Sequence, residues 1–232
     1  MAYLPAHTGG CRWDCINQPI FKKGDAGVQL NRLERLFILS PVRALLQRHW
    51  EARQLLAMGG PLTGAHVLET GCGPGFGIDL LYRRFKADRV DAFDLDPKMI
   101  ALLHRRQRTR GPRARLWVGN VRHIPVADAS YDAVVNFGAI HHVVRWREAL
   151  GEIARVLKPG RPFYCEEILS YYITHPLLGR LMDHPQEDRF DAHQFISALQ
   201  QEGFRVRRFR QLADLYLWVV AVKDTHCRAA HQ

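Results

Sequence analysis

The chain has 232 residues, of which 47% are hydrophobic and 24% are charged. This composition is ordinary for a globular protein, and the length favours one domain of about 200 residues plus a terminal extension. No apolar run approaches the roughly 18 residues that span a bilayer, and the N-terminus lacks the basic and apolar regions of a secretory signal. We therefore expect a cytoplasmic protein. The formal charge of +10 leaves nucleic acid, anionic lipid and acidic substrates open as partners.

The five cysteines are odd in number and widely spaced, which argues against a disulfide framework. Cys11 and Cys15 have a C-x3-C spacing that could serve metal binding, but no second pair stands nearby. We expect reduced thiols and no metal site.

Basic residues are densest in two groups, residues 104–110 and residues 205–210. Each group has two readings. Residues 104–110 form either a solvated helix end or a binding patch, and residues 205–210 form either the exposed face of a strand or a binding patch.

Residues 1–60 are predicted to be an N-terminal segment with helices that cover the active site. Residues 1–27 are irregular but rich in aromatic side chains, so we expect them to pack on the body of the protein. Apolar residues at helical spacing predict a helix over 28–39, and a Ser-Pro pair then starts a second helix that ends near Met58. These helices either cover the sheet or form a membrane-surface or substrate-gating element.

Strands and helices alternate in the rest of the chain, residues 61–232. Strands are predicted over 67–70, 90–95, 114–118, 131–137 and 163–167, with helices over 76–86, 97–108 and 147–157. The alternation lapses in an insertion at about 169–190, which we place on the substrate side. Asp191 then caps a helix over 192–201, and two closing strands follow over 204–210 and 215–222.

Repeated strand–helix units imply parallel strands with right-handed crossovers, and two closing strands with a short link imply an antiparallel edge. We therefore predict an α/β fold, with a doubly wound, mostly parallel, seven-stranded Rossmann-like sheet, an antiparallel edge strand and the N-terminal helices.

One stretch of this pattern points to a ligand. The segment from Glu69 to Gly77 reads E-x-G-x-G-x-G-x-G between a strand and a helix, which is the nucleotide-cradling unit of doubly wound folds. Glycines are needed there because the chain turns sharply and a ligand approaches the backbone. The third glycine comes one residue too early for the dinucleotide fingerprint, and the Gly-Lys-Ser/Thr of a P-loop is absent.

With the later motifs in their expected order, residues 64–222 resemble the class I S-adenosylmethionine-dependent methyltransferases. The similarity is greatest to the small-molecule and lipid branch, which includes ubiquinone/menaquinone-type C-methyltransferases. The resemblance implies S-adenosyl-L-methionine as the cofactor and S-adenosyl-L-homocysteine as its product. It also identifies residues 147–161, with the Leu-Lys-Pro-Gly turn, as architectural.

The resemblance implies a role for each cofactor-binding residue. Glu69 would order the ammonium group, the glycine turn would bind the carboxylate, and Asp94 would accept from the ribose hydroxyls. Asn120 stands where the family usually has Asp, and it keeps an acceptor for the adenine amino group. Asp96 is better read as a helix N-cap. The full predicted set is Glu69, Gly71, Cys72, Gly73, Gly75, Asp94, Leu95, Met99, Asn120, Val121 and Asn136.

Candidate catalytic residues follow the strands over 131–137 and 163–167. His141 is predicted to face the substrate. His142 is expected to pack under the next helix, because neighbours in sequence point apart unless they lie on a bend. Glu166 and Tyr172 are further candidates, since acidic and aromatic groups at the carboxyl edge of such a sheet lie where ligands bind. A base near neutral pH would serve a hydroxyl or carbon acceptor.

Three functions stay open on these patterns. The first is methyl transfer to a small molecule or lipid, with peripheral contact to an anionic membrane as one version. The second is an RNA methyltransferase, but the chain has no separate RNA-binding module and no Asn/Asp-Pro-Pro-Tyr/Phe motif, so nucleic acid is not the expected partner. The third is a cofactor-binding scaffold without catalysis, against which the intact loop and Asp94 weigh.

Overall fold

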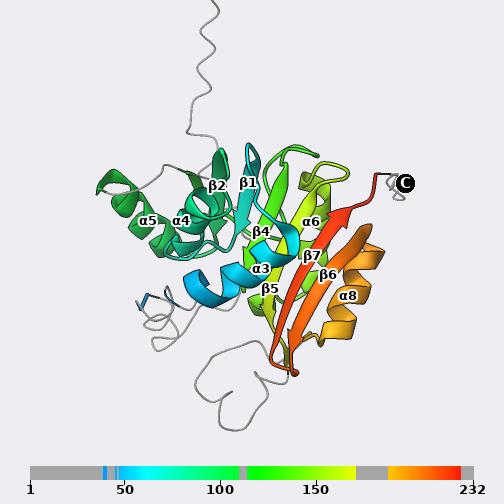
Figure 1. Ribbon diagram of the computed structural model, residues 1–232. Coiled ribbons are helices and arrows are strands. Elements are labelled where there is room, and N and C mark those ends of the chain that lie inside the picture. The colour runs from blue at the N-terminus through cyan, green and yellow to red at the C-terminus, as the bar shows by residue number, and fades with distance from the viewer. Residues whose placement is uncertain (1–38, 41–44, 46, 110–113, 171–187, 226–232) are drawn as a thin grey trace, which may run out of the picture.

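The computed structural model describes residues 39–40, 45, 47–109, 114–170 and 188–225 (Figure 1). The helix predicted over 28–39, most of the insertion and the candidate Tyr172 lie outside these residues. Among the described residues, no helix is long and apolar enough to cross a membrane.

A seven-stranded sheet forms the centre of the molecule, in the strand order β3-β2-β1-β4-β5-β7-β6. The strands are β1 His66–Thr70, β2 Arg89–Asp94, β3 Arg115–Val118, β4 Ala133–Phe137, β5 Pro162–Ile168, β6 Phe204–Leu212 and β7 Tyr216–Lys223. Strands β1 to β5 pair in parallel, and β7 runs antiparallel to both β5 and β6. The predicted mostly parallel sheet with an antiparallel strand near its edge is confirmed.

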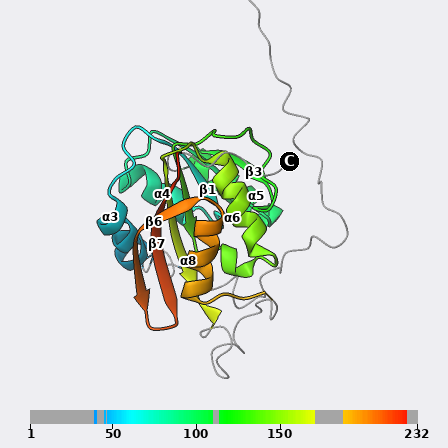
Figure 2. The ribbon, with the colours of Figure 1, turned by 90° about the vertical axis from the view of Figure 1, so that its right-hand side faces the viewer.

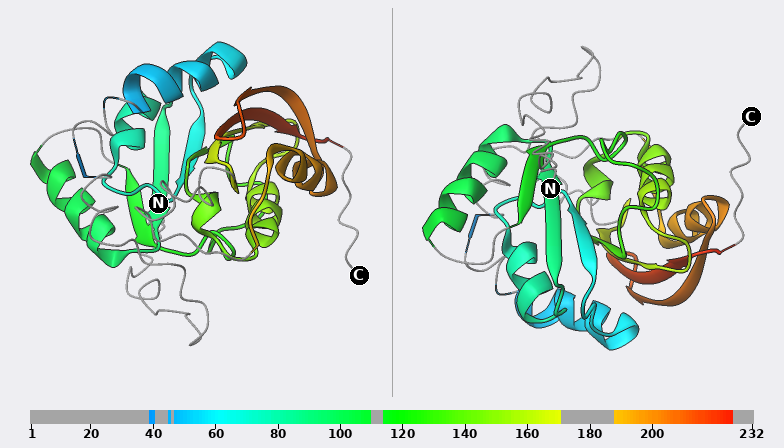
Figure 3. Two further views of the ribbon diagram at one scale, coloured as in Figure 1. Left: turned by 90° about the horizontal axis from the view of Figure 1, so that it is seen from below. Right: turned by 90° about the horizontal axis from the view of Figure 1, so that it is seen from above.

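Helices cover both faces of this sheet. They are η2 Gln47–Glu51 (a π-helical turn), α3 Ala52–Gly59, α4 Phe76–Arg83, α5 Pro97–Thr109, η3 Ile140–His142 (a 3-10 turn), α6 Trp146–Val156 and α8 Ala192–Gln201. Two apolar cores result. One packs α3, α4 and α5 against the sheet, and the other packs α6 and α8 against the opposite face. Figures 2 and 3 show α3 and α8 on opposite sides of the sheet.

Two predicted helix caps are present. Asp191 accepts from the backbone N–H of Gln194 at 2.7 Å, and the Gln194 side chain accepts in return from the Asp191 N–H, which makes a capping box at α8. Asp96 accepts from the N–H of Lys98 at 2.8 Å at the start of α5. Both caps satisfy N–H groups that have no partner within their helix.

The loop between β3 and β4 is held by one side chain of α6. Arg155 donates to the carbonyl oxygens of Ile124 and Val126 at 2.7 and 2.8 Å, and it pairs with Glu152 and Asp128. This agrees with the architectural role expected of the α6 region, because Arg155 fixes the loop that carries Asn120 to α6.

Candidate functional site

The glycine loop joins β1 to α4 at the carboxyl edge of the sheet, the edge marked by the β6–β7 turn at the bottom of Figure 1. Gly75 is the N-cap of α4 and has φ +84°, in the left-handed region that side chains other than glycine rarely adopt. The loop is joined to its neighbour strand through the Cys72 N–H, which donates to the Phe93 carbonyl oxygen at 3.0 Å. The backbone turn is thus closed at the start of α4, where helix N–H groups favour anions.

Glu69 is the last residue but one of β1, next to this loop, and is 2% exposed. A Cβ on Gly77 would collide with its Oε1 atom, so the glycine makes room for the carboxyl group. Burial raises the pKa of Glu69 well above its ordinary value, and the nearby Asp94 and Asp79 add to the shift. Its Oε2 atom is buried and has no hydrogen-bond partner in the part of the chain that the structure describes. A cationic donor would supply what this acceptor lacks.

Asp94 lies across the loop at the end of β2. Its Oδ2 atom accepts from the Gly73 N–H and its Oδ1 atom from the Asp96 N–H, both at 2.8 Å. Each carboxylate oxygen therefore has further acceptor capacity. Burial raises the pKa of Asp94, and the two backbone donors oppose the rise.

Arg106 closes the same loop from α5. It donates to the Pro74 carbonyl oxygen at 3.0 Å, pairs with the Asp79 carboxylate, and lies 5.0 Å from the ring centre of Phe76. The basic group at 104–110 is therefore not wholly a solvated helix end, because Arg106 is a structural part of the loop.

The other residues predicted to bind the cofactor lie around this loop in different environments. Cys72 and Met99 are buried, while Leu95, Asn120 and Val121 are half-buried. The Oδ1 atom of Asn120 accepts from the Arg122 N–H at 3.0 Å. Asn120 follows Gly119, whose N–H donates to the Asp94 carbonyl oxygen at 3.0 Å, so β3 and β2 end side by side here.

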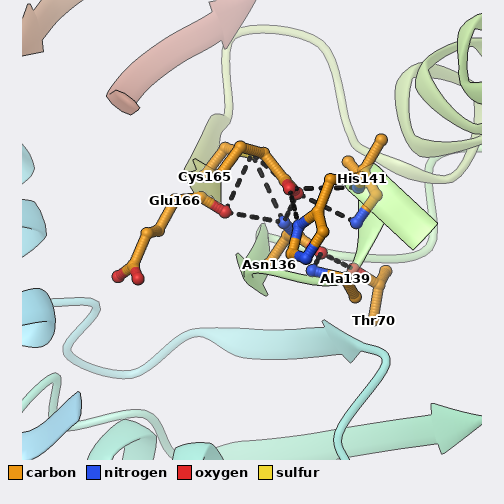
Figure 4. Close-up of polar contacts among 8 residues, drawn as sticks. Thr70, Asn136, Ala139, His141, Cys165 and Glu166 are labelled. Atoms are coloured by element: carbon orange, nitrogen blue, oxygen red, sulfur yellow. Dashed lines mark hydrogen bonds and ion pairs between the residues drawn. The ribbon is translucent and has the colours of Figure 1, made fainter. Parts of the chain in front are cut away.

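A second polar cluster occupies the ends of β4 and β5 (Figure 4). The Asn136 side chain is its centre and is fully buried. Its Oδ1 atom accepts from the Thr70 hydroxyl at 3.1 Å and from the Ala139 N–H at 3.3 Å, while its amide donates to the Glu167 carboxyl group and to the Glu166 carbonyl oxygen. The Asn136 side chain therefore links the turn after β4, through its oxygen, to the end of β5, through its nitrogen.

Glu167 completes the cluster and is the residue that sequence reasoning missed. It is 0% exposed and accepts from the N–H groups of Ile140 and His141 at 2.9 and 3.1 Å. Its Oε2 atom lies 2.7 Å from Nδ1 of His141, in a hydrogen bond whose direction depends on the tautomer of the ring. Burial raises the pKa of Glu167 to about 8, although its hydrogen-bond donors favour the carboxylate.

The neighbouring candidate, Glu166, lies on the other face of β5. Its carboxylate points away from the cluster in Figure 4, and it is 2% exposed. Side chains alternate between the faces of a strand, and Asn136 pairs with Cys165, so Glu167 rather than Glu166 shares the face of Asn136. This parity was the signal in the sequence that could have distinguished the two acids.

His141 and His142 lie together rather than apart. Their ring centres are 4.1 Å apart, because both residues belong to the 3-10 turn η3. The exception for neighbours on a bend therefore applies at this turn. The His141 side chain is 4% exposed, so its imidazole is shielded from bulk water.

Comparisons with known proteins match this arrangement. The model of a methyltransferase domain family matches residues 67–160. A demethylmenaquinone methyltransferase of Lactiplantibacillus plantarum is 30% identical over 186 residues, covering 73% of this chain and 75% of that relative. A relative from Mycolicibacterium smegmatis, named for S-adenosylmethionine-dependent methyl transfer, is 41% identical over 100 residues, or 43% of this chain.

The matched part spans only 37% of the length of that Mycolicibacterium relative. Among solved structures, an S-adenosylmethionine-dependent methyltransferase from Aquifex aeolicus has a TM-score of 0.66 at 19% identity, with 83% of this chain and 98% of that chain covered. At this identity the structural likeness supports the fold.

Proposed function

This chain belongs to the class I S-adenosylmethionine-dependent methyltransferases, and we propose that it transfers a methyl group from that cofactor to a small-molecule or lipid acceptor. The observation that carries the proposal is the buried Glu69 carboxyl group, whose Oε2 atom has no partner among the described residues. A buried acceptor without a donor is costly in a finished fold, and the ammonium group of the cofactor would satisfy it.

The remaining polar groups of the loop fit the rest of that cofactor. The acceptor capacity left on Asp94 suits ribose hydroxyls, and the N-terminus of α4, which follows the turn of Gly71, Gly73 and Gly75, suits a carboxylate. Around the adenine we place Leu95, Met99, Val121 and the Asn120 amide, with Cys72 in the wall of the loop. Asn136 would act indirectly, without contacting the cofactor. Its amide already links the turn after β4 to β5 and so would position that turn.

The bound cofactor supplies a methyl group that is electrophilic because it is attached to a sulfonium. The protein then has to hold the acceptor in line and exclude water. For a hydroxyl or carbon acceptor it also has to remove a proton. We assign that step to His141, whose Nδ1 is held by Glu167 so that Nε2 is the nitrogen through which the ring would accept the proton.

Two other candidates are retained with separate roles. Glu166 is buried on the α3 face of β5, away from the Glu167 cluster, so we propose that it lines the opposite wall of the acceptor site. Tyr172 follows β5 in the part of the chain outside the described residues, and its role as a substrate contact is proposed from sequence alone.

A lipid or quinone-like acceptor is supported by the surface as well as by the name of the Lactiplantibacillus relative. Strand β6 exposes four arginines, with Phe209 54% and Leu212 47% exposed on the same strand. Basic residues beside exposed apolar side chains suit an anionic lipid surface. We therefore propose a cytoplasmic protein that meets the membrane through β6.

The proposed function is tested by incubating the full chain with a cell extract and methyl-labelled cofactor, followed by mass spectrometry. We expect label in one class of small molecule or lipid, and none after omission of the protein. Cofactor binding without label in any product would instead support the scaffold, and label in RNA would support the nucleic-acid alternative.

A further inference from the structure

A short segment, residues 188–190, is hydrogen-bonded to two other parts of the chain at the carboxyl edge of the sheet. The Ser170 N–H, just past the end of β5, donates to the Phe190 carbonyl oxygen at 3.1 Å. The Arg145 N–H, just before α6, donates to the Asp188 carboxylate at 2.8 Å. Arg189 is therefore held at the carboxyl edge of the sheet, between the residues that follow β5 and the residue that precedes α6. Ligands bind at this edge in folds of this type.

Several arginines of this corner pair with two acids. Arg122 and Arg145 both pair with Glu148, at 3.4 and 3.1 Å, and Arg147 pairs with Asp188 at 3.1 Å. Within the described part of the chain, these three arginines and Arg189 thus lie around two carboxylates. A cluster of basic side chains favours an anionic ligand at this position.

Arg189 itself has no partner among the described residues. All three of its guanidinium nitrogens are shielded from solvent and lack a hydrogen bond. Burial alone lowers the pKa of Arg189, yet a guanidinium stays protonated at neutral pH. A shielded cation without an acceptor is costly, and an anionic ligand would supply the acceptor that the described residues do not.

The guanidinium has a geometry suited to one class of ligand. Its planar fork of donors matches the two oxygens of a carboxylate or a phosphate, and such charge-assisted pairs are the strong hydrogen bonds of proteins. We propose that Arg189 binds a carboxylate or phosphate group of the methyl acceptor, so that the acceptor is an anion. The inference rests on the proposed function, because it names the substrate class of the same site.

Equilibrium binding tests the proposal without requiring turnover. The full chain, loaded with S-adenosylhomocysteine, is titrated by calorimetry with octanoate, octyl phosphate and octanol. We expect octanoate or octyl phosphate to bind at least tenfold more tightly than octanol, and the better of the two identifies the headgroup. Arg189→Gln should remove that preference. Equal binding of octanol and both anions, or an unchanged preference in Arg189→Gln, would overturn the proposal.

Arg147→Gln is the matched control, because it removes the same charge from the same corner but from an arginine that already has a partner. We expect it to change anion affinity less than threefold, and a loss equal to that of Arg189→Gln would overturn a specific role for Arg189. Thermal melting adds an independent readout. Arg189→Gln should melt at or above the wild-type temperature, whereas a lower temperature would point to a structural role and count against the proposal.

The proposed function and the assignment of Arg189 can each be wrong without the other. If S-adenosylhomocysteine binds but neither anion is preferred, the assignment of Arg189 is wrong and the proposed function stands. If S-adenosylhomocysteine does not bind, the proposed function is wrong, and titration of the ligand-free protein with the same three probes decides on Arg189.

Discussion

The Nδ1 atom of His141 lies 2.7 Å from Oε2 of Glu167, and the two side chains are 4% and 0% exposed. A proton held between such groups belongs to the pair rather than to either residue. Burial raises the pKa of Glu167 to about 8, so the pair retains an extra proton at neutral pH and loses it above that value. Only the form that has lost the proton can accept another from a substrate.

The rate of methyl transfer to a hydroxyl or carbon acceptor should therefore rise with pH, with an apparent pKa of about 8. Below this value the pair is already protonated, and above it the His141 imidazole can accept a proton. Measurement of kcat between pH 6 and 9.5 checks this. Glu167→Gln should lower kcat by about 10²-fold or more and remove the rise near pH 8, on the scale of a lost general base.

The matched control for this profile is Glu202→Gln, a carboxylate on the far end of α8. It should keep both the wild-type rate and the wild-type pH dependence. A Glu167→Gln enzyme with an unchanged profile would show that the pair takes no part in proton transfer.

Gly77→Ala should displace Glu69 from its place under the loop. The added Cβ would meet Oε1 of Glu69 and the Phe137 ring, neither of which has room to retreat. Overpacking of this kind costs about 1–3 kcal/mol of stability, and we expect at least tenfold weaker binding of S-adenosylhomocysteine. Chemical denaturation and calorimetry measure the two effects.

Gly151→Ala provides the comparison, because Gly151 lies inside α6 and faces the flexible end of Glu202. Alanine in a helix interior is favoured over glycine by about 0.5–1 kcal/mol, so this variant should be as stable as the wild type or more so. Full cofactor binding by Gly77→Ala would contradict the placement of Glu69.

Arg106→Gln should make the glycine loop less rigid, although the Arg106 side chain is not proposed to contact the cofactor. The change removes the hydrogen bond to Pro74, the pairing with Asp79 and the contact with Phe76. We expect a threefold to tenfold loss of affinity for S-adenosylhomocysteine, equal to about 0.7–1.4 kcal/mol. Arg105→Gln, at an exposed position of the same helix, should bind as the wild type does, and equal losses in both variants would point to general electrostatics instead.

The double change Arg207→Gln and Arg208→Gln should weaken sedimentation with anionic vesicles. Each basic residue near a lipid surface contributes about 1 kcal/mol, so the two together predict a loss of roughly tenfold or more. Arg83→Gln with Arg84→Gln makes the same charge change at the exposed end of α4 and should have little effect. No vesicle binding by the wild type would rule out membrane contact through β6.

The sheet and its helices could be predicted because they depend on local patterns. Apolar periodicity marked the strands, and short polar residues before helices marked the caps at Asp96 and Asp191. The glycine spacing identified the loop between β1 and α4. Each of these features involves residues close together in the sequence.

The site could be predicted only in part, because its decisive contacts join residues that are far apart. Glu167 and His141 are in contact although they are 26 residues apart in the sequence, and Arg106 and Pro74 are in contact although they are 32 residues apart. The absence of a hydrogen-bond partner for Arg189 among the described residues is likewise visible only when the partners of its neighbours are known. Alternation along β5 separates Glu167 from Glu166, but composition and spacing do not identify the partners of these residues.

The central claim is that the loop between Glu69 and Asp94 holds S-adenosylmethionine, and titration calorimetry with S-adenosylhomocysteine tests it most directly. The account predicts one site per chain in the wild type and at least tenfold weaker binding in Asp94→Asn, whose single acceptor oxygen can serve only one of the two backbone N–H groups that Asp94 binds. Absence of binding to the wild type, or equal affinity in the two proteins, would contradict it.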